Sequence, residues 1–252
     1  MIRNLAILAA LVFFAACSSD DSPAASSDGI DRVEPPFWWA GFVHEELQLL
    51  VQGDGLAEFT PSVSAPGIAI SRVERGDSPN YLFVYLDIGG APAGKFDIVF
   101  ENGDERVARS YELRERVPGR VGTYDASDVM YLITPDRFVN GDASNDNVEG
   151  YADELNRADD YGRHGGDIEG VRQQLDYIAD MGFTQIWLNP VLENAMERAS
   201  YHGYATTDYY KVDPRFGTNE SYRQLADEAR DKGIGIIMDM IANHAGSGHW
   251  WM

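Results

Sequence analysis

Three polar side chains end the last apolar run of the sequence. In the stretch "GIIMDMIANHAG", residues 235–246, the apolar residues give way to Asp239, Asn243 and His244. A carboxylate, an amide and an imidazole after a strand are typical of the rim of a site. No serine lies at a strand-to-helix elbow, which excludes the usual catalytic triad, and zinc would lack a third ligand. The alternative is a set of hydrogen-bonding groups at a strand end.

A second group of polar residues lies in "DRFVNGDASNDN", residues 136–147. Asn140, Asp142, Asn145 and Asp146 place four oxygen-bearing side chains within seven residues. A hard cation such as Ca²⁺ prefers about six to eight oxygen ligands, and such a loop supplies several of them. The spacing is not that of an EF-hand. An Asx-rich turn without an ion explains the same composition.

Two further motifs carry groups suited to binding. In "HGGDIEG", residues 164–170, Asp167 lies where a helix begins, so it is either part of a site or a simple N-cap. In "YHGYATTDYYKVDPRFGT", residues 201–218, aromatic and carboxylate groups alternate around His202 and Tyr204. This pattern indicates a loop that binds a sugar ring, or else a solvated surface with packed tyrosines.

The elements that position these motifs follow an alternating pattern from Asp128 onward. Apolar runs predict strands, and periodic apolar residues predict helices between them, the second with Asn219 as its N-cap. The predicted strands cover 129–135, 183–190 and 234–243, and the predicted helices cover 168–182 and 219–233. This order predicts a parallel sheet whose strand ends carry the polar residues.

Residues 31–118 have a different pattern. Short apolar runs are separated by Gly, Pro, Asp and Asn, and an Asn-Gly step within 101–105 predicts a hairpin. Strands at this spacing indicate an antiparallel β-sandwich. The aromatic stretch at 37–42 is either a sugar-binding surface or part of the core of this sandwich.

The charge balance limits the classes of partner. Lys and Arg number 20 and Asp and Glu number 41, which gives a formal net charge of −21. Nucleic-acid binding depends on basic patches that neutralise phosphates, so no nucleic-acid partner is expected. The acidity is otherwise explained by solubility.

The N-terminus predicts export. Residues 1–17 contain Arg3, an apolar run over 5–16 and Cys17. The run is shorter than the roughly 20 residues that cross a bilayer, so it indicates a signal peptide. Small residues before Cys17 resemble a lipobox, which predicts a lipid anchor on a membrane surface in the periplasm, outer membrane or cell surface. The alternative is an ordinary signal peptide. Residues 18–30 have the composition of a flexible tether.

Taken in order, these motifs resemble the N-terminal portion of a glycoside hydrolase family 13 enzyme, the α-amylase family. The resemblance is to the cyclomaltodextrinase, neopullulanase and maltogenic amylase branch, and it covers about residues 32–252. It implies an immunoglobulin-like β-sandwich over 31–120 and the first three β/α units of a (β/α)8 TIM barrel over 121–252.

The resemblance also implies a Ca²⁺ site that ties the Asx-rich loop to the following helix. Its ligands match six residues of this chain, one of them through its backbone carbonyl. They are Asn140, Asp142, Asn145, Asp146, Gly165 (carbonyl) and Asp167.

For the substrate side, the resemblance implies that Tyr204 stacks on a glucose ring and that His244 hydrogen-bonds the same sugar. His202 is expected nearby, and Asp239 resembles a carboxylate that orients groups beneath the catalytic pair. In this family, the nucleophile and the acid/base follow later strands, so we expect both downstream of Met252.

The parent enzyme is therefore expected to cleave α-1,4-glucosidic bonds of cyclodextrins, pullulan or maltooligosaccharides with retention. The chain itself is expected to be a truncated, inactive fragment. Relatives often form dimers through the sandwich, which implies a homodimer of the parent. The competing hypothesis is a non-catalytic lipoprotein that binds α-glucan oligosaccharides.

Overall fold

The computed structural model describes residues 29–119 and 122–252, which form two compact units that divide between Arg116 and Val117. The predicted signal peptide, with Cys17, lies outside the described residues, as does nearly all of the predicted tether. Ile30 corrects the end of that tether, because its side chain is buried in the core of the first unit. In the part of the chain that is described, no helix is long and apolar enough to cross a membrane.

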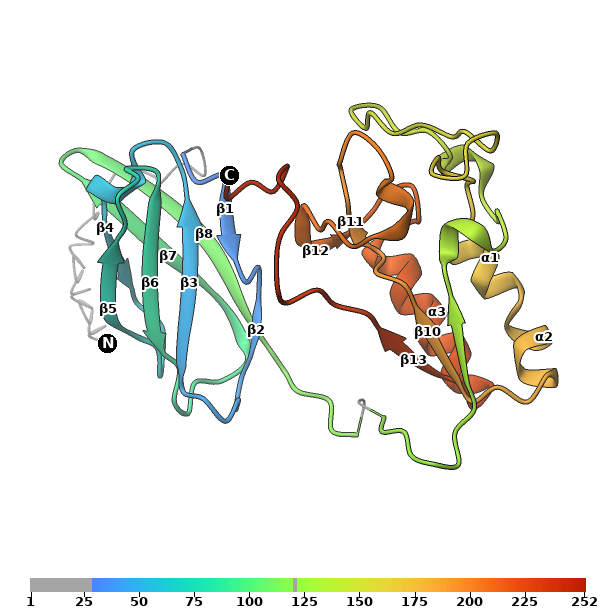
Figure 1. Cartoon of the computed structure of the whole chain (residues 1–252). Helices are drawn as coiled ribbons and strands as arrows, with labels where there is room; N and C mark the ends of the chain where they lie inside the picture. The colour runs from blue at the N-terminus through green and yellow to red at the C-terminus, as the bar shows by residue number, and fades with distance from the viewer. Residues whose placement is uncertain (1–28, 120–121) are drawn as a thin grey trace, which may run out of the picture. The chain divides into compact units, whose positions relative to one another are not determined.

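The first unit consists of two four-stranded sheets (Figure 1). The strands of one sheet lie in the order β1-β3-β6-β5: Arg32–Glu34, Glu46–Gln52, Tyr81–Asp87 and Ala69–Arg75. The strands of the other lie in the order β2-β8-β7-β4: Trp38–Trp39, Glu105–Arg114, Gly94–Asn102 and Thr60–Val63. All pairs are antiparallel except β2 with β8. A short 3-10 helix, η1, covers Leu56–Glu58.

Alternation along the strands builds a core between these sheets. In β6, Leu82, Val84 and Leu86 are fully buried, because side chains of a strand point alternately to its two faces. The predicted hairpin joins β7 to β8 with Asn102 paired to Glu105. Gly103 takes the left-handed conformation that this turn requires. The predicted β-sandwich is therefore confirmed.

The opening segment of the first unit contributes one strand to each sheet. β1 pairs with β3, and β2, three residues later, pairs with the last residues of β8. Trp38 packs against the core, and Phe37 lies under the guanidinium of Arg114 at 3.5 Å. These contacts give much of the aromatic stretch a packing role.

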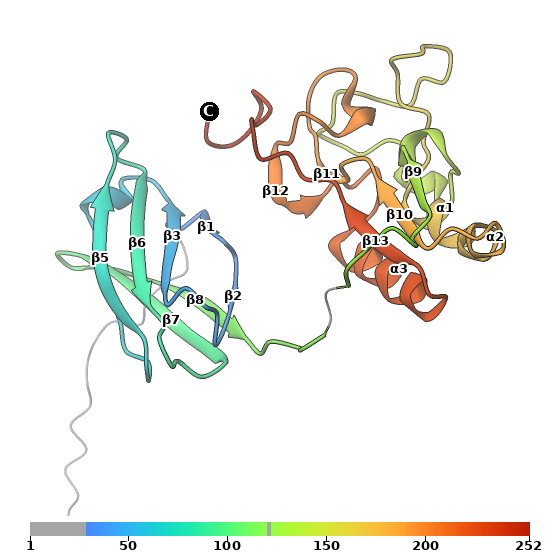
Figure 2. The same ribbon diagram turned by 60° about the horizontal axis from the view of Figure 1, so that its bottom comes forward.

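The second unit contains a parallel three-stranded sheet with the order β9-β10-β13 (Figures 1 and 2). The strands are Met130–Ile133, Gln185–Leu188 and Gly235–Met238, and the helices are α1 (Ile168–Gln173), α2 (Leu175–Asp180) and α3 (Asn219–Asp231). The three strands of this sheet lie side by side in their chain order, as at the start of the expected barrel. The helices bury an apolar core that includes Ile168, Leu175, Ile186 and Leu225.

On the face of this sheet that the helices do not cover, large apolar side chains are exposed. Met130, Leu132 and Trp187 alternate with buried or half-buried neighbours and retain 38–54% of their accessible surface. In a closed barrel, this face would line the interior, which side chains fill. Within the described residues, β13 pairs with β10 alone and therefore forms an edge of the sheet.

Three local expectations need correction. The predicted helix over 168–182 is divided at Gln174, whose φ and ψ of −101° and 7° leave the helical region. The N-cap of α3 is Thr218, which forms a capping box with Ser221, whereas the Asn219 side chain bonds the backbone of Val212 and Tyr210. The loop over 201–218 contains a strand, so it is not wholly irregular. β12 (Asp208–Val212) pairs with β11 (Leu192–Glu193).

Candidate functional site

Asp239 lies directly after β13, and two ring donors reach its carboxylate from other parts of the chain. Its Oδ2 atom accepts hydrogen bonds of 3.2 Å from Trp187 Nε1 and from Tyr204 OH. Trp187 belongs to β10, whose carboxyl end lies beside that of β13 because the strands are parallel. Tyr204 comes from the long segment between β11 and β12. The fold thus joins two strand ends and one loop at a single carboxylate.

Both predicted histidines contact Tyr204. His244 Nε2 lies 2.9 Å from the backbone oxygen of Tyr204, and His202 Nδ1 accepts the Tyr204 backbone N–H at 2.9 Å. The rings of His202 and Tyr204 are 5.7 Å apart. Tyr209 holds the backbone of His244 through a hydrogen bond of 2.7 Å from its hydroxyl. The four predicted substrate-side residues therefore form one cluster, which we call the Tyr204 cluster: His202, Tyr204, Asp239 and His244.

The electrostatics of this cluster follow from its surroundings. Burial raises the pKa of Tyr204, and the nearby Asp239 carboxylate raises it further. Burial lowers the pKa of His202 below its ordinary value of 6.5. Tyr204 therefore remains a hydrogen-bond donor at neutral pH, and His202 remains neutral, which leaves Nδ1 able to accept the Tyr204 N–H.

A nuclear magnetic resonance titration of the His202 ring is expected to give a midpoint below 6.5. Protonation must overcome burial and break the bond from the Tyr204 N–H to Nδ1. Because the unfolded chain then binds the proton more tightly, this contribution to stability is complete above pH 6.5 and is lost as the pH falls through the lower, folded-state pKa. A midpoint above 6.5 would contradict the expectation.

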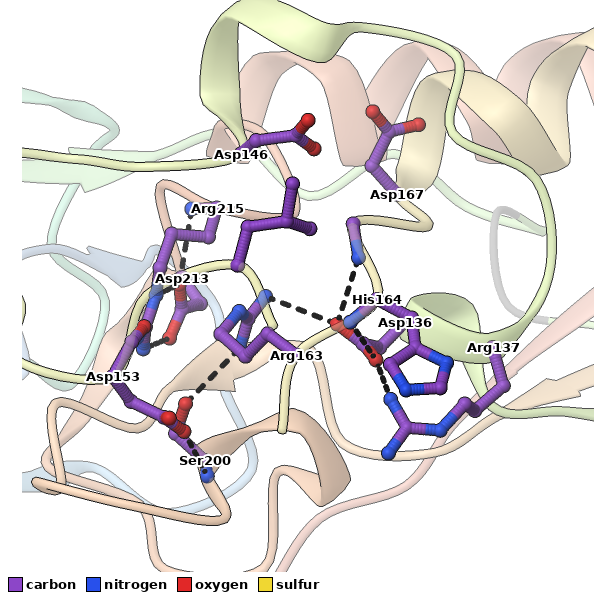
Figure 3. A network of polar contacts seen from close by, with 12 residues as sticks. Asp136, Arg137, Asp146, Asp153, Arg163, His164, Asp167, Ser200, Asp213 and Arg215 are labelled. Carbon is purple, nitrogen blue, oxygen red and sulfur yellow. Dashed lines mark hydrogen bonds and ion pairs between the residues drawn. The ribbon is translucent and has the colours of Figure 1, made fainter. Parts of the chain in front are cut away.

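The Asx-rich loop folds onto the start of α1 (Figure 3). Asp167 caps the helix by accepting the Gly170 N–H at 2.6 Å. The same carboxylate accepts the backbone N–H groups of Gly141 and Asp142 and the side-chain amide of Asn145. Asp167 is therefore both an N-cap and a brace for the loop, two roles that the sequence offered as alternatives.

The remaining predicted ligands lie around this brace. Asn140 Nδ2 donates to Asp146 Oδ1 at 2.7 Å, and a Cβ atom at Gly165 would lie 2.4 Å from the same Oδ1. Asp142 accepts hydrogen bonds from the backbone and hydroxyl of Ser144, which lower its pKa. The structure thus brings the six predicted residues into one neighbourhood.

The donor chemistry of this neighbourhood fits a hard cation. Within the described residues, no group of three or more His, Cys, Asp or Glu side chains is arranged to hold a metal ion. Here three carboxylates are supplemented by two amides and a carbonyl, and the buried Asn145 Oδ1 atom has no hydrogen-bond partner. A cation would satisfy that oxygen, and the amide of Asn140 can rotate to present its own oxygen.

A buried network connects Asp136, which follows β9, to Ser200, two residues before His202 (Figure 3). The Arg163 guanidinium is 1% exposed; its Nη1 atom donates to Ser200 Oγ at 3.2 Å, and its Nη2 atom lies 3.8 Å from Asp136 Oδ1. Asp136 in turn accepts the backbone N–H of His164 at 2.8 Å and that of Gly165 at 3.3 Å. Burial lowers the pKa of Arg163, which the carboxylates around it oppose.

A second buried ion pair completes the network. Arg215 holds Asp213 with two hydrogen bonds, Nε to Oδ1 at 2.9 Å and Nη2 to Oδ2 at 2.7 Å. The same guanidinium donates to the backbone oxygens of Asp153 and Asn194. Asp213 also accepts the Asn194 N–H. This pair fixes the segments on either side of β11 and β12.

A cavity of about 590 Å³ opens beside the Tyr204 cluster. His202 is part of both, and the other walls come from the segment after β11 and from the chain after β13. These walls include Met196, Arg198, Ala205 and Gly248. A mixed apolar and polar lining of this kind suits a ring with hydroxyl groups.

Comparison with protein families decides the assignment. Residues 132–252 match the family described as alpha amylase, catalytic domain, and residues 32–117 match the one described as cyclomaltodextrinase, N-terminal. The chain belongs to the α-amylase family. The two matched ranges coincide with the partial barrel sheet and with the β-sandwich.

Individual proteins are similar to parts of this chain. A β/α-amylase of Paenibacillus polymyxa is 43% identical over 129 residues, which is 51% of this chain and 10% of that protein. Neopullulanase 2 of Thermoactinomyces vulgaris is 42% identical, over 47% of this chain and 20% of that protein. An α-amylase of Geobacillus thermoleovorans, solved with acarbose, is 42% identical over 49% of this chain and 25% of its own, with a TM-score of 0.43. The matches span about a tenth to a quarter of these relatives.

Two groups of residues in this α-amylase-family chain were not predicted from the sequence. Trp187 is apolar and lies in a strand, so nothing local indicated that its Nε1 atom would reach Asp239. Arg163 and Arg215 are charged residues within loops, where exposure is the usual expectation. Arg163 approaches the carboxylate of Asp136 from far along the chain, whereas Arg215 pairs with the nearby Asp213 and reaches the distant backbone oxygens of Asp153 and Asn194.

Proposed function

We propose that this chain forms the substrate-side part of a retaining α-glucan hydrolase that acts on α-1,4-glucosidic bonds. The α-amylase family match supports hydrolysis of glucans, and the relatives named neopullulanase and cyclomaltodextrinase support cyclodextrins, pullulan or maltooligosaccharides as the substrate class. The observation that carries the proposal is the convergence of Tyr204, Trp187 and His244 around Asp239 at the carboxyl ends of two barrel strands.

In this proposal, Asp239 orients groups and is not the nucleophile. A retaining glycosidase needs two carboxylates about 5 Å apart, one nucleophile and one acid/base. Asp239 is instead engaged as the acceptor for Trp187 and Tyr204, which fixes both rings. The Tyr204 ring then offers a face to a glucose unit, and His244 offers an imidazole to its hydroxyl groups. The chain is proposed to bind glucan without hydrolysing it.

Calorimetric titration of the chain with maltotetraose tests glucan binding. Tyr204→Ala is expected to lower the affinity by about tenfold, because an aromatic contact contributes about 0.5–1.5 kcal/mol beyond its buried area. Tyr204→Phe keeps the ring and loses only the bond to Asp239, so its affinity should lie between the two. Tyr177→Ala, on the exposed face of α2, should bind as the unaltered chain does.

Equal affinity of the unaltered chain and Tyr204→Ala would contradict the assignment of the Tyr204 cluster. Release of reducing sugar from a cyclodextrin by the chain alone would contradict the absence of the catalytic pair. These two results are independent, so each part of the proposal fails separately.

The proposed cofactor is Ca²⁺, held by Asn140, Asp142, Asn145, Asp146, the Gly165 carbonyl and Asp167. When bound, the ion neutralises the three carboxylates and joins the loop to the start of α1. The contacts of Asp167 with the loop backbone and the unpartnered Asn145 Oδ1 atom support this arrangement.

Thermal unfolding in calcium and in chelator tests this site. A concentration of Ca²⁺ one hundredfold above Kd should stabilise the second unit by about 2.7 kcal/mol. Asp146→Asn removes one carboxylate charge and should reduce this gain, whereas Asp176→Asn alters an exposed residue of α2 and should leave it unchanged. Identical melting in calcium and chelator for the unaltered chain would contradict the proposal.

Export, the lipid anchor on Cys17 and a homodimer of the parent stay predictions. The described residues begin after Cys17, and the structure contains one chain.

A further inference from the structure

The segment that carries His202 and Tyr204 has an unusual backbone. It forms a 3-10 helix, η4, over Ser200–His202, with a residue in the left-handed region on each side. Gly203 tolerates its φ of 80°, but Ala199 has a φ of 55°, a left-handed conformation that is unfavourable for a residue with a side chain. Such a conformation persists only where the surroundings hold it.

Hydrogen bonds of Ser200 hold this segment in place. It is fully buried, and all three of its polar groups are paired. Its N–H donates to Asp153 Oδ2 at 2.8 Å, and its backbone oxygen accepts from Asn194 Nδ2 at 3.1 Å. Its hydroxyl accepts from Arg163 Nη1 at 3.2 Å. Asp153 and Asn194 lie in neighbouring loops, whereas Arg163 connects Ser200 to the Asx-rich loop.

Arg163 connects Ser200 to the Asx-rich loop through Asp136. Its second nitrogen lies 3.8 Å from Asp136, whose carboxylate accepts the backbone N–H groups of His164 and Gly165. Gly165 is one of the proposed calcium donors and lies against Asp146. A continuous path of polar contacts therefore runs from the Asx-rich loop through Asp136 and Arg163 to Ser200 in η4 (Figure 3).

We propose that Arg163 is a positioning residue that couples calcium occupancy of the Asx-rich loop to the order of residues 200–204. The coupling rests on the proposed calcium function and adds to it an effect on the glucan-binding side. A cation that draws the Gly165 carbonyl inward fixes the adjacent N–H groups on Asp136. Asp136 then holds the guanidinium, and the guanidinium holds the strained segment in the conformation that presents Tyr204. Binding that orders one element in this way reduces the cost of ordering the next.

Hydrogen–deuterium exchange of the full chain measures this coupling at the backbone N–H groups of Gly203 and Tyr204. Both are hydrogen-bonded within the segment, to the Ser200 oxygen and to His202 Nδ1. Calcium is expected to slow their exchange at least fivefold. Replacing Arg163 itself would remove a buried charge from a network in which Asp136 keeps its pair with Arg137, and would disturb more than one contact. Ser200→Ala is therefore the informative change. It removes only the hydroxyl that accepts from Nη1, and the effect of calcium on exchange should be lost.

Thr206→Val is the matched control. Its hydroxyl is as buried as that of Ser200 and lies in the same loop, but it has no hydrogen-bond partner. Calcium should therefore protect Gly203 and Tyr204 in Thr206→Val as in the unaltered chain. Calcium affinity of Ser200→Ala, measured by calorimetry, should fall by no more than the lost protection factor, because coupling between two sites is reciprocal.

The outcomes separate the inference from the function on which it rests. Protection in the unaltered chain and in Thr206→Val, without protection in Ser200→Ala, supports the coupling. Equal protection in Ser200→Ala overturns it. Calcium binding without protection of the unaltered chain also overturns it but leaves the calcium site intact. If calorimetry detects no calcium binding, both the calcium site and the coupling fail.

Discussion

Replacement of Arg215 by Ala is expected to destabilise the second unit by about 3–5 kcal/mol, a large share of the roughly 5–15 kcal/mol that stabilises a typical domain. Arg215 and Asp213 are both at most 1% exposed and form a two-point ion pair. Without the guanidinium, the Asp213 carboxylate stays buried without its counter-charge. The backbone oxygens of Asp153 and Asn194 lose a donor as well.

Urea unfolding of the full chain measures this effect, and Arg223→Ala is the matched control. Arg223 also pairs with carboxylates, Glu220 and Asp227, but about half of its side chain is exposed on α3. An exposed pair contributes about 0–1 kcal/mol, because water screens it. Similar losses for the two variants would show that burial of the Arg215 pair has little energetic weight.

Gly203→Ala is expected to cost about 2–5 kcal/mol and to abolish glucan binding. The φ of Gly203 is 80°, and an added Cβ would lie 2.0 Å from the backbone oxygen of Pro190. The left-handed backbone costs about 1–2 kcal/mol, and relief of the overlap costs about 1–3 kcal/mol more. Because Tyr204 is the next residue, the required movement displaces its ring from Asp239.

Gly182→Ala separates these two contributions. Gly182 follows α2 with a φ of 84°, and an added Cβ would meet nothing within 4 Å. Its substitution should therefore cost only the backbone contribution and leave the Tyr204 cluster unchanged. Equal losses of stability in the two variants, measured by urea unfolding, would refute the steric explanation for Gly203.

The local pattern of apolar residues was sufficient to predict most of the strands and helices. The alternation in "YLFVYLD" predicts β6, and the apolar period of residues 219–231 predicts α3, because both elements bury one face. The break at Gln174 was not predicted, since the apolar period continues through it from Val171 to Ile178. The N-cap of α3 was displaced by one residue, because Thr218 and Asn219 are both good caps.

The site depended on contacts that no local pattern contains. The grouping of Tyr204, His244 and Asp239 was expected from the resemblance to the α-amylase family, and the order of motifs carried that expectation. Trp187 and Arg163 were missed because their partners lie 52 and 37 residues away. A tryptophan in a strand and an arginine in a loop look ordinary until the sheet and loops bring the partners together.

The placement of β1 and β2 in different sheets of the sandwich has a mechanical consequence. The chain enters the first unit through β1 and β2, and β2 lies beside the end of β8, where the chain leaves for the second unit. A pull between the two ends of this unit is therefore borne by the parallel rungs Trp38–Leu113 and Trp39–Arg114 and by the bond from Ala40 N to the Arg114 oxygen. Opposed forces along parallel neighbours load these rungs in shear, and the remaining strands carry little tension.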